Sequence, residues 1–144
     1  MAVIKRSRDF PVAPHVLWRT LSDPKTQNRW WPGVMRVEGD SKHGFTQVSR
    51  SSRGVVVRSD FLRSKTTEPE LLVWTQQLAG TPFASVFAER VIEVRLEPDG
   101  AGGSKVTLVV TRELKGAACY MPLNRGGVKR QLDAALDGLA ELAG

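Results

Sequence analysis

The sequence predicts an α+β protein in which one seven-stranded antiparallel sheet is combined with a long C-terminal helix. Two observations carry this prediction. Six consecutive segments in the middle of the chain alternate apolar and polar residues, and short turns separate them. Short connections of this kind join antiparallel neighbours. The last segment of the chain instead repeats its apolar residues with the spacing of a helix.

The N-terminal part is expected to form a first strand and then two short helices. Residues 3–10 alternate as a strand does. Pro14 suits the first position of a helix, where its missing N–H would have no partner in any case. Asp23 and Pro24 are suited to be the N-cap and first residue of a second helix, and Pro32 ends that helix.

The following segments predict the other six strands, at residues 35–39, 45–51, 55–65, 71–78, 83–96 and 105–114. Turns rich in glycine and proline separate them. Alternation predicts which side chains face inward. The expected inward sets are Val55, Val57, Ser59 and Phe61; Leu72, Trp74, Gln76 and Leu78; and the even positions Val86, Ala88, Ile92, Val94, Leu96, Val106, Leu108 and Val110.

The C-terminal helix is predicted to begin at Asn124 or nearer Pro122. Its apolar stripe is Val128, Leu132, Ala135, Leu136, Leu139 and Leu142. Gly126 and Gly127 weaken its first turns. Two interpretations are open. The glycines could form a hinge that opens a cavity, or they could mark a frayed helix start or a close contact with a strand.

Three short motifs support a more specific interpretation: Ala-Pro-His-Val-Leu-Trp at residues 13–18, Ser-Asp-Pro at 22–24 and Trp-Trp-Pro-Gly-Val at 30–34. Together they resemble the N-terminal signature of the START-like (SRPBCC) superfamily, especially its polyketide cyclase/dehydrase-like branch. The resemblance implies a helix-grip fold, in which the sheet wraps around the long helix. It also implies a single ligand-binding domain over residues 1–144. An internal cavity between sheet and helix would bind a hydrophobic small molecule of lipid, polyketide or aromatic type.

The composition of the chain limits the kinds of partner that we expect it to bind. The formal net charge is +6, but the basic residues are scattered, so we expect a solvated basic surface and no specific nucleic acid. A protein-interaction module that uses this surface is one alternative function. The apolar runs are strand-sized, so we expect no integral membrane association. The single cysteine, Cys119, and the lack of a signal peptide favour the cytoplasm. An exposed edge strand would permit a homodimer.

Groups for catalysis are few. His15 and His43 are the only histidines, and no metal-binding, cofactor-binding or phosphate-binding motif is visible. We therefore predict no metal, no cofactor and no catalytic residue. A cyclase/dehydrase-type enzyme is the second alternative function, implied by the resemblance alone. Its candidate groups would be Glu89, Arg90, Arg112 and Tyr120.

The strongest candidates for ligand contact are polar residues at inward positions. Arg90 falls between Ala88 and Ile92, and Arg112 follows Val110 with the same parity. A buried arginine needs a carboxylate or an anionic ligand, because an unpaired buried charge is costly. The alternative is a bulge near Arg90 that reverses the alternation, or a strand end that reaches water. The full set of candidate ligand-binding residues is Trp31, Phe45, Phe61, Trp74, Gln76, Phe87, Arg90, Arg112, Tyr120 and Leu132.

Overall fold

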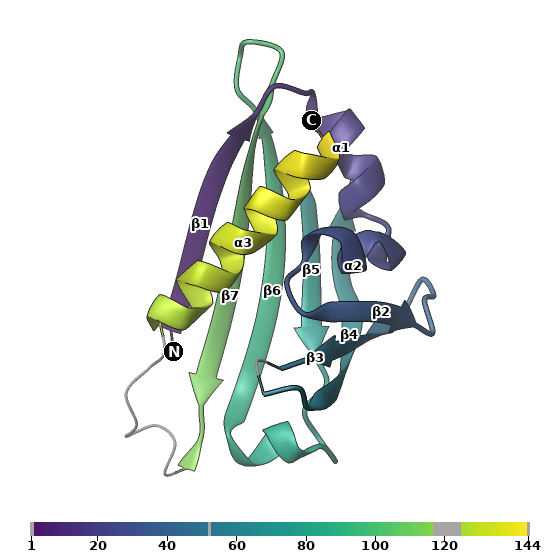
Figure 1. Ribbon diagram of the computed structural model, residues 1–144, viewed down its shortest axis with the longest axis vertical. Coiled ribbons are helices and arrows are strands. Elements are labelled where there is room, and N and C mark those ends of the chain that lie inside the picture. The colour runs from purple at the N-terminus through teal and green to yellow at the C-terminus, as the bar shows by residue number, and fades with distance from the viewer. Residues whose placement is uncertain (1, 52, 117–124, 144) are drawn as a thin grey trace.

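The structure is a computed structural model that describes residues 2–51, 53–116 and 125–143. One curved antiparallel sheet contains all seven predicted strands, in the spatial order β1-β7-β6-β5-β4-β3-β2 (Figure 1). Consecutive strands are neighbours except where β1 pairs with β7. The strands are β1 (Ala2–Phe10), β2 (Val34–Glu38), β3 (Gly44–Arg50), β4 (Val56–Thr67), β5 (Leu71–Gln76), β6 (Phe87–Pro98) and β7 (Ser104–Leu114).

The short helices lie between β1 and β2, as predicted. Helix α1 (Pro14–Leu21) begins at its proline. A 3₁₀ turn, η1 (Pro24–Thr26), leads directly into α2 (Gln27–Trp30). The Asp23 carboxylate caps η1 by accepting a hydrogen bond of 3.1 Å from the Lys25 backbone N–H. This satisfies one of the backbone donors that the start of a helix leaves without a partner.

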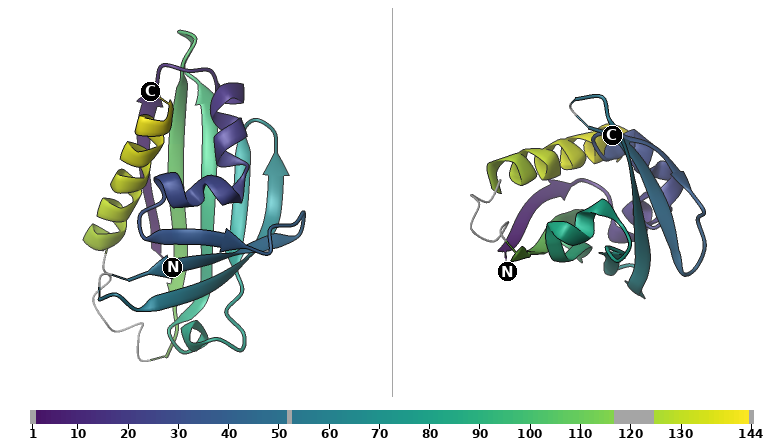
Figure 2. Two further views of the ribbon diagram at one scale, coloured as in Figure 1. Left: turned by 45° about the vertical axis from the view of Figure 1, so that its right-hand side comes forward. Right: turned by 90° about the horizontal axis from the view of Figure 1, so that it is seen from below.

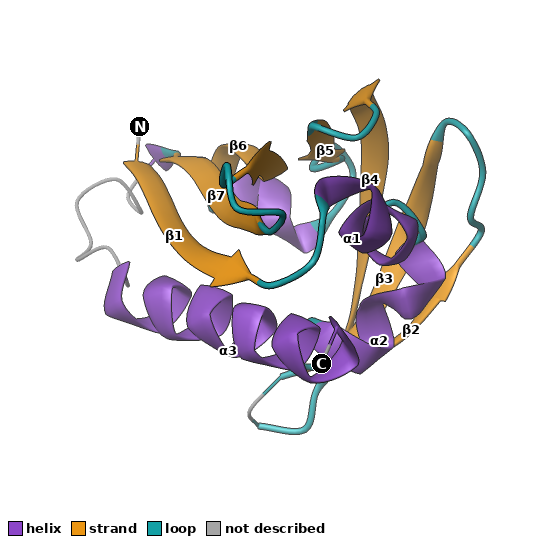
Figure 3. Ribbon diagram, turned by 90° about the horizontal axis from the view of Figure 1, so that it is seen from above, coloured by secondary structure: helices purple, strands orange, loops and turns teal. Residues whose placement is uncertain are grey.

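Helix α3 (Arg125–Ala143) lies across the concave side of the sheet (Figures 1 and 3). Its buried residues are Leu132, Ala135, Leu136 and Leu139. Two ion pairs tie its exposed side to β1, Arg6 to Asp133 at 2.8 Å and Arg8 to Asp137. The seven-stranded sheet and closing helix confirm the predicted helix-grip arrangement. Leu142, predicted on the apolar stripe, is 42% exposed because it lies in the last turn, and the predicted starts at Asn124 and Pro122 lie outside the described residues.

A glycine allows α3 to pack closely on α2. A Cβ atom added at Gly138 would lie 2.6 Å from the Trp30 backbone oxygen and 2.9 Å from its Cα. These distances are far inside van der Waals contact, so any side chain at this position would push the helices apart. The absence of a side chain at Gly138 therefore determines how closely α3 approaches α2. Gly126, which the sequence analysis singled out, has only the Arg130 side chain nearby, at 3.4 Å.

The start of β6 differs from the sequence prediction. Pro82 begins a 3₁₀ turn, η2 (Pro82–Ser85), so the strand starts at Phe87 and not at residue 83. A bulge between Phe87 and Glu89 then adds one residue on this strand relative to β7. Because a bulge reverses the alternation, Ala88 is exposed. Val86, also predicted to face inward, lies at the end of η2, before the strand, and is 40% exposed. Val55 was also predicted to face inward, but it precedes β4 and is 59% exposed.

Candidate functional site

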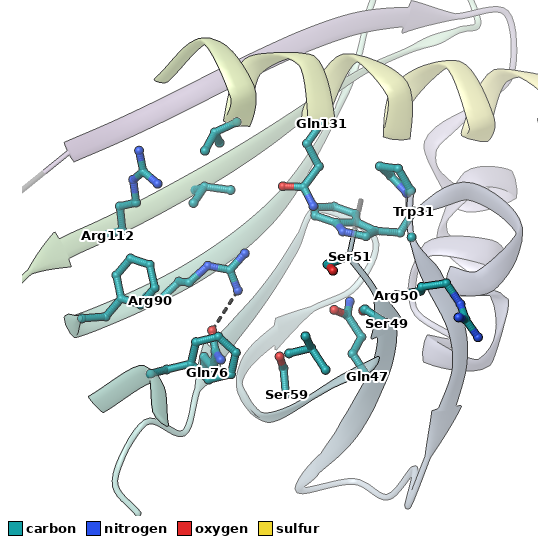
Figure 4. Close-up of a pocket in the computed structure, with 17 residues that line it drawn as sticks. Trp31, Gln47, Ser49, Arg50, Ser51, Ser59, Gln76, Arg90, Arg112 and Gln131 are labelled. Atoms are coloured by element: carbon teal, nitrogen blue, oxygen red, sulfur yellow. Dashed lines mark hydrogen bonds between the residues drawn. The ribbon is translucent and has the colours of Figure 1, made fainter. Parts of the chain in front are cut away.

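A cavity of about 350 Å³ lies between α3 and the concave face of the sheet, partly open to solvent (Figure 4). Its walls come from the Trp31–Gly33 segment, the β3–β4 hairpin, η2, strands β5 to β7 and the first turns of α3. The apolar wall consists of Trp31, Pro32, Val57, Phe83, Phe87, Val110 and Val128. The polar wall consists of Gln47, Ser49, Arg50, Ser51, Ser59, Gln76, Arg90, Arg112 and Gln131, and Gly33 completes the lining.

Arg90 and Arg112 form the main positive charge of this cavity. They are directly opposite each other across β6 and β7. Like charges in such a cross-strand pair repel each other. Arg90 Nη1 donates a hydrogen bond of 2.8 Å to Gln76 Oε1, and the Arg90 side chain reaches toward the middle of the cavity (Figure 4). Among the described residues, no carboxylate forms an ion pair with either guanidinium.

Arg112 is less satisfied than Arg90. Its Nε and Nη2 atoms are buried and have no hydrogen-bond partner in the described part of the chain. Buried N–H donors without a partner usually cost about 1–3 kcal/mol each, and more when the group is charged. The site therefore presents donors that an oxygen-bearing anion would satisfy.

The surroundings disfavour the charged forms of the Arg90 and Arg112 guanidinium groups. Burial, and then the nearby Arg112, lower the pKa of Arg90 to about 10. Burial, followed by repulsion from Arg125, also lowers the pKa of Arg112. A guanidinium pKa falls when desolvation and like charge oppose the cation. With a pKa of about 10, Arg90 remains protonated at neutral pH, and an anion near both guanidinium groups would stabilise their charged forms.

A second polar region lies on the β3 and β4 side of the cavity. Gln47 Nε2 donates a hydrogen bond of 2.6 Å to the Oε1 atom of Gln27, a residue of α2 that is fully buried. This contact holds the Gln47 amide at the cavity wall near Ser59 (Figure 4). The Nε2 atom of Gln27 has no partner among the described residues. Ser59 was recognised in the sequence as a polar residue on an inward face, whereas Gln47 was missed.

The structure divides the predicted ligand-binding residues into three groups. Those that line the cavity are Trp31, Gln76, Phe87, Arg90 and Arg112. Those that lie in the hydrophobic core and do not line it are Phe45, Phe61, Trp74 and Leu132. Tyr120 lies outside the described residues, as does Cys119.

Phe45, Phe61 and Trp74 are inward-facing, as strand alternation predicts, and Leu132 lies on the buried side of α3, but all four belong to the hydrophobic core. The Phe45 ring stacks on Phe61 with 5.5 Å between centroids and meets Trp74 edge-on at 5.4 Å. Leu132 is fully buried in α3. Strand alternation reports the face of the sheet, but it does not report how far along each strand the core ends and the cavity begins.

The described cavity wall carries no Asp, Glu, His or Lys side chain. Glu89 is not among the lining residues, and His43 lines a separate shallow depression beside Asp60. Within residues 2–51, 53–116 and 125–143, no three or more His, Cys, Asp or Glu side chains form a group suited to a metal ion. The described site therefore offers hydrogen-bond donors and positive charge.

The chain belongs to the family described as polyketide cyclase/dehydrase and lipid transport, whose model matches residues 1–144. This confirms the resemblance seen in the three N-terminal motifs. No curated protein gives a significant match.

Solved structures share the fold at low sequence identity. A conserved protein from Geobacillus kaustophilus has a TM-score of 0.78 and 14% identity, with 99% of this chain and 95% of that chain covered. The Zhui aromatase/cyclase from Streptomyces sp. R1128 has a TM-score of 0.77 and 13% identity, with 99% of this chain and 93% of that chain covered. A START superfamily protein from Mycobacterium smegmatis has a TM-score of 0.74 and 12% identity, covering 99% of both chains. At these identities the likeness shows the fold alone.

No helix in the described part of the chain is both long and apolar enough to cross a membrane.

Proposed function

We propose that this protein binds a small molecule with an apolar, planar or chain-like body and one acidic group. The ligand body would contact the aromatic wall of Trp31, Phe83 and Phe87. Its carboxylate, phenolate or enolate oxygen would accept hydrogen bonds from Arg90 and Arg112. The observation that carries this proposal is the cross-strand pair of arginines without a carboxylate partner among the described residues.

The energetics favour an anion over a neutral polar group. An arginine pair inside a protein is unfavourable by itself, since repulsion and desolvation act together. The attraction of an anion to both guanidinium groups offsets their repulsion and desolvation, and its oxygens satisfy the free donors of Arg112. The apolar body adds to this: burying about 300 Å² of apolar surface gains about 7 kcal/mol before the cost of association. Binding in the micromolar range is therefore expected.

A matched pair of probes tests the proposal. In a fluorescence or calorimetric titration, 2-naphthoate should bind at least about tenfold more tightly than 2-naphthylmethanol, because only the carboxylate engages charged donors. Both probes carry the same ring system, so the ratio isolates the acidic group. Equal affinities for the two probes would contradict the proposal.

The same titration has an expected pH profile. The carboxylate of the probe is ionised above about pH 5, since carboxyl pKa values are near 4. The pKa of Arg90 in the free protein is about 10. The affinity for 2-naphthoate should therefore be constant between about pH 6 and 9 and should fall as the pH rises through the pKa of Arg90. The affinity for 2-naphthylmethanol should not change over this range.

The cyclase/dehydrase alternative would use the same arginines, which would stabilise an enolate during ring closure. The fold shared with an aromatase/cyclase is compatible with it. The described wall, however, contains no carboxylate or imidazole to remove a proton, and we therefore favour binding. The cytoplasmic location, the homodimer and the lack of specific nucleic-acid binding stay predictions.

A further inference from the structure

The charges of this chain are distributed unevenly around the cavity. Residues 41–59, 71–88 and 114–132 contain no Asp or Glu, although the whole chain has 15. These three segments contribute most of the cavity wall, from Gln47 on β3 to Gln131 on α3. Acidic residues are confined to the rest of the molecule. The described cavity wall therefore carries arginines and no acidic side chain, although Glu89 and Glu113 lie opposite each other on β6 and β7, close to Val86 and Lys115.

Cations and exposed valines together form a surface that we call the mouth rim. It consists of Arg50, Arg53, Val55 and Val56 on the β3–β4 hairpin, Val86 and Lys115 beside each other, and Arg125 and Lys129 on the first turns of α3. Val55 is 59% exposed, Val56 51% and Val86 40%. The Lys115 N–H donates to the Val86 carbonyl at 2.9 Å, which joins the η2 and β7 parts of the rim. Figure 2 shows the hairpin, η2 and the start of α3 at one end of the molecule.

The rim cations keep their charge free. Elsewhere, six arginines form ion pairs with carboxylates, among them Arg6, Arg36 and Arg95. Within the described residues, none of Arg50, Arg53, Arg125 or Lys129 forms an ion pair. The guanidinium of Arg50 donates a hydrogen bond to the Gly54 carbonyl, at 3.4 Å. A surface on which unpaired cations outnumber the neighbouring carboxylates Glu89 and Glu113 is complementary to a negatively charged partner.

We propose that the mouth rim docks on the surface of an anionic lipid bilayer. Clustered Lys and Arg side chains are attracted to anionic lipid headgroups. The valines at the tip of the hairpin would enter the interfacial region between those headgroups, as exposed apolar residues flanked by cations do. This places the opening of the cavity against the bilayer.

A bilayer fits this surface better than an acidic protein does. A stable protein interface needs about 800 Å² of complementary surface on each partner, with a well-packed apolar centre. The rim offers only a few valines, which stand on a hairpin and a turn. Such a convex apolar tip matches a deformable headgroup layer and has no need of a shaped partner.

Vesicle sedimentation with the full chain tests the proposal. Vesicles of phosphatidylcholine and phosphatidylglycerol at 7:3 should bind the protein, and vesicles of phosphatidylcholine alone should bind it much more weakly. Arg53→Glu should lower the partition coefficient at least about fivefold, since each cation near an anionic surface contributes about one factor of this size. Arg53 does not line the cavity, so this variant should still bind 2-naphthoate with unchanged affinity. Failure of docking is thereby separated from failure of ligand binding.

Two further variants sharpen the result. Lys105→Glu makes the same change of charge on β7, away from the rim, at an exposed residue without an ion pair in the described part of the chain; it should leave vesicle binding nearly unchanged. The double variant Val55→Ser with Val56→Ser keeps the charge and should weaken binding several-fold. The proposal would be overturned by equal binding to both kinds of vesicle, or by equal losses in Arg53→Glu and Lys105→Glu. Retention on immobilised polyglutamate without vesicle binding would instead assign the rim to an acidic macromolecule.

Discussion

Replacing Arg90 or Arg112 with methionine is expected to weaken the binding of 2-naphthoate by about ten- to hundredfold and to leave 2-naphthylmethanol binding nearly unchanged. A hydrogen bond to a charged group contributes about 1.5–3 kcal/mol, and each variant removes the donors of one guanidinium. Methionine keeps a similar length and apolar stem, so the cavity stays filled. Titration of both probes against each variant measures the effect.

The Arg112→Met variant should also be more stable than the original protein when no ligand is bound. Arg112 has buried donors without partners in the described chain, and it lies opposite Arg90. Removing one member of a repelling, desolvated pair should raise the free energy of unfolding by about 1 kcal/mol. Urea denaturation measures this change. A gain in stability together with a loss of carboxylate binding is what a ligand site predicts, because binding residues are not optimised for folding.

Arg95→Met is the matched control on the same strand. Arg95 belongs to β6, but it is exposed and paired with Glu93 at 2.6 Å. Replacing Arg95 should leave the affinities for both 2-naphthoate and 2-naphthylmethanol unchanged. The ligand proposal fails if Arg90→Met and Arg112→Met bind 2-naphthoate as tightly as the original protein, or if both probes lose affinity equally.

Gly138→Ala is expected to destabilise the protein by about 2 kcal/mol or more, although alanine is the better helix former. The added Cβ would lie 2.6 Å from the Trp30 backbone oxygen, and backbone atoms cannot move aside as a flexible side chain can. Overpacking of this kind costs about 1–3 kcal/mol. The displaced helix would also shift Val128 and Gln131, which line the cavity from α3. Urea denaturation and probe titration report the two effects.

Gly126→Ala is the matched control in the same helix. Its Cβ would meet only the Arg130 side chain, at 3.4 Å. The substitution should raise stability by about 0.5 kcal/mol by reducing the freedom of the unfolded chain. Opposite signs for the two substitutions would show that close packing on α2, and not helix propensity, determines the cost at Gly138. A stabilised Gly138→Ala variant would contradict the close approach of α2 and α3.

The fold could be predicted because its signals are local. Pro14, Asp23 and Pro24 specify where the short helices begin, and each does so in the structure. Strand alternation and helical spacing gave the order of the long elements correctly. The predicted start of β6 was wrong because a 3₁₀ turn begins at Pro82. The predicted inward position of Ala88 was wrong because a bulge between Phe87 and Glu89 reverses the alternation, and nothing in the local pattern of this sequence indicates where the extra residue falls.

The site was only partly predictable, because a cavity depends on where long-range packing stops. Arg90 and Arg112 were recognisable as charges on an inward face. The bulge lies before Arg90, so the alternation from Arg90 onward is as predicted and both arginines line the cavity. Gln47 has the same parity as Phe45 on β3, so strand alternation also places it on the inward face. Gln131 gave no comparable signal, since polar residues are common beside the apolar stripe of a helix.

The most direct test of the central claim is a crystal structure of the protein with 2-naphthoate. The account predicts the naphthyl ring against Trp31 and Phe87, with carboxylate oxygens at hydrogen-bond distance, about 2.7–3.2 Å, from guanidinium nitrogens of both Arg90 and Arg112. A ring bound in the cavity with its carboxylate directed to solvent, away from both arginines, would contradict it.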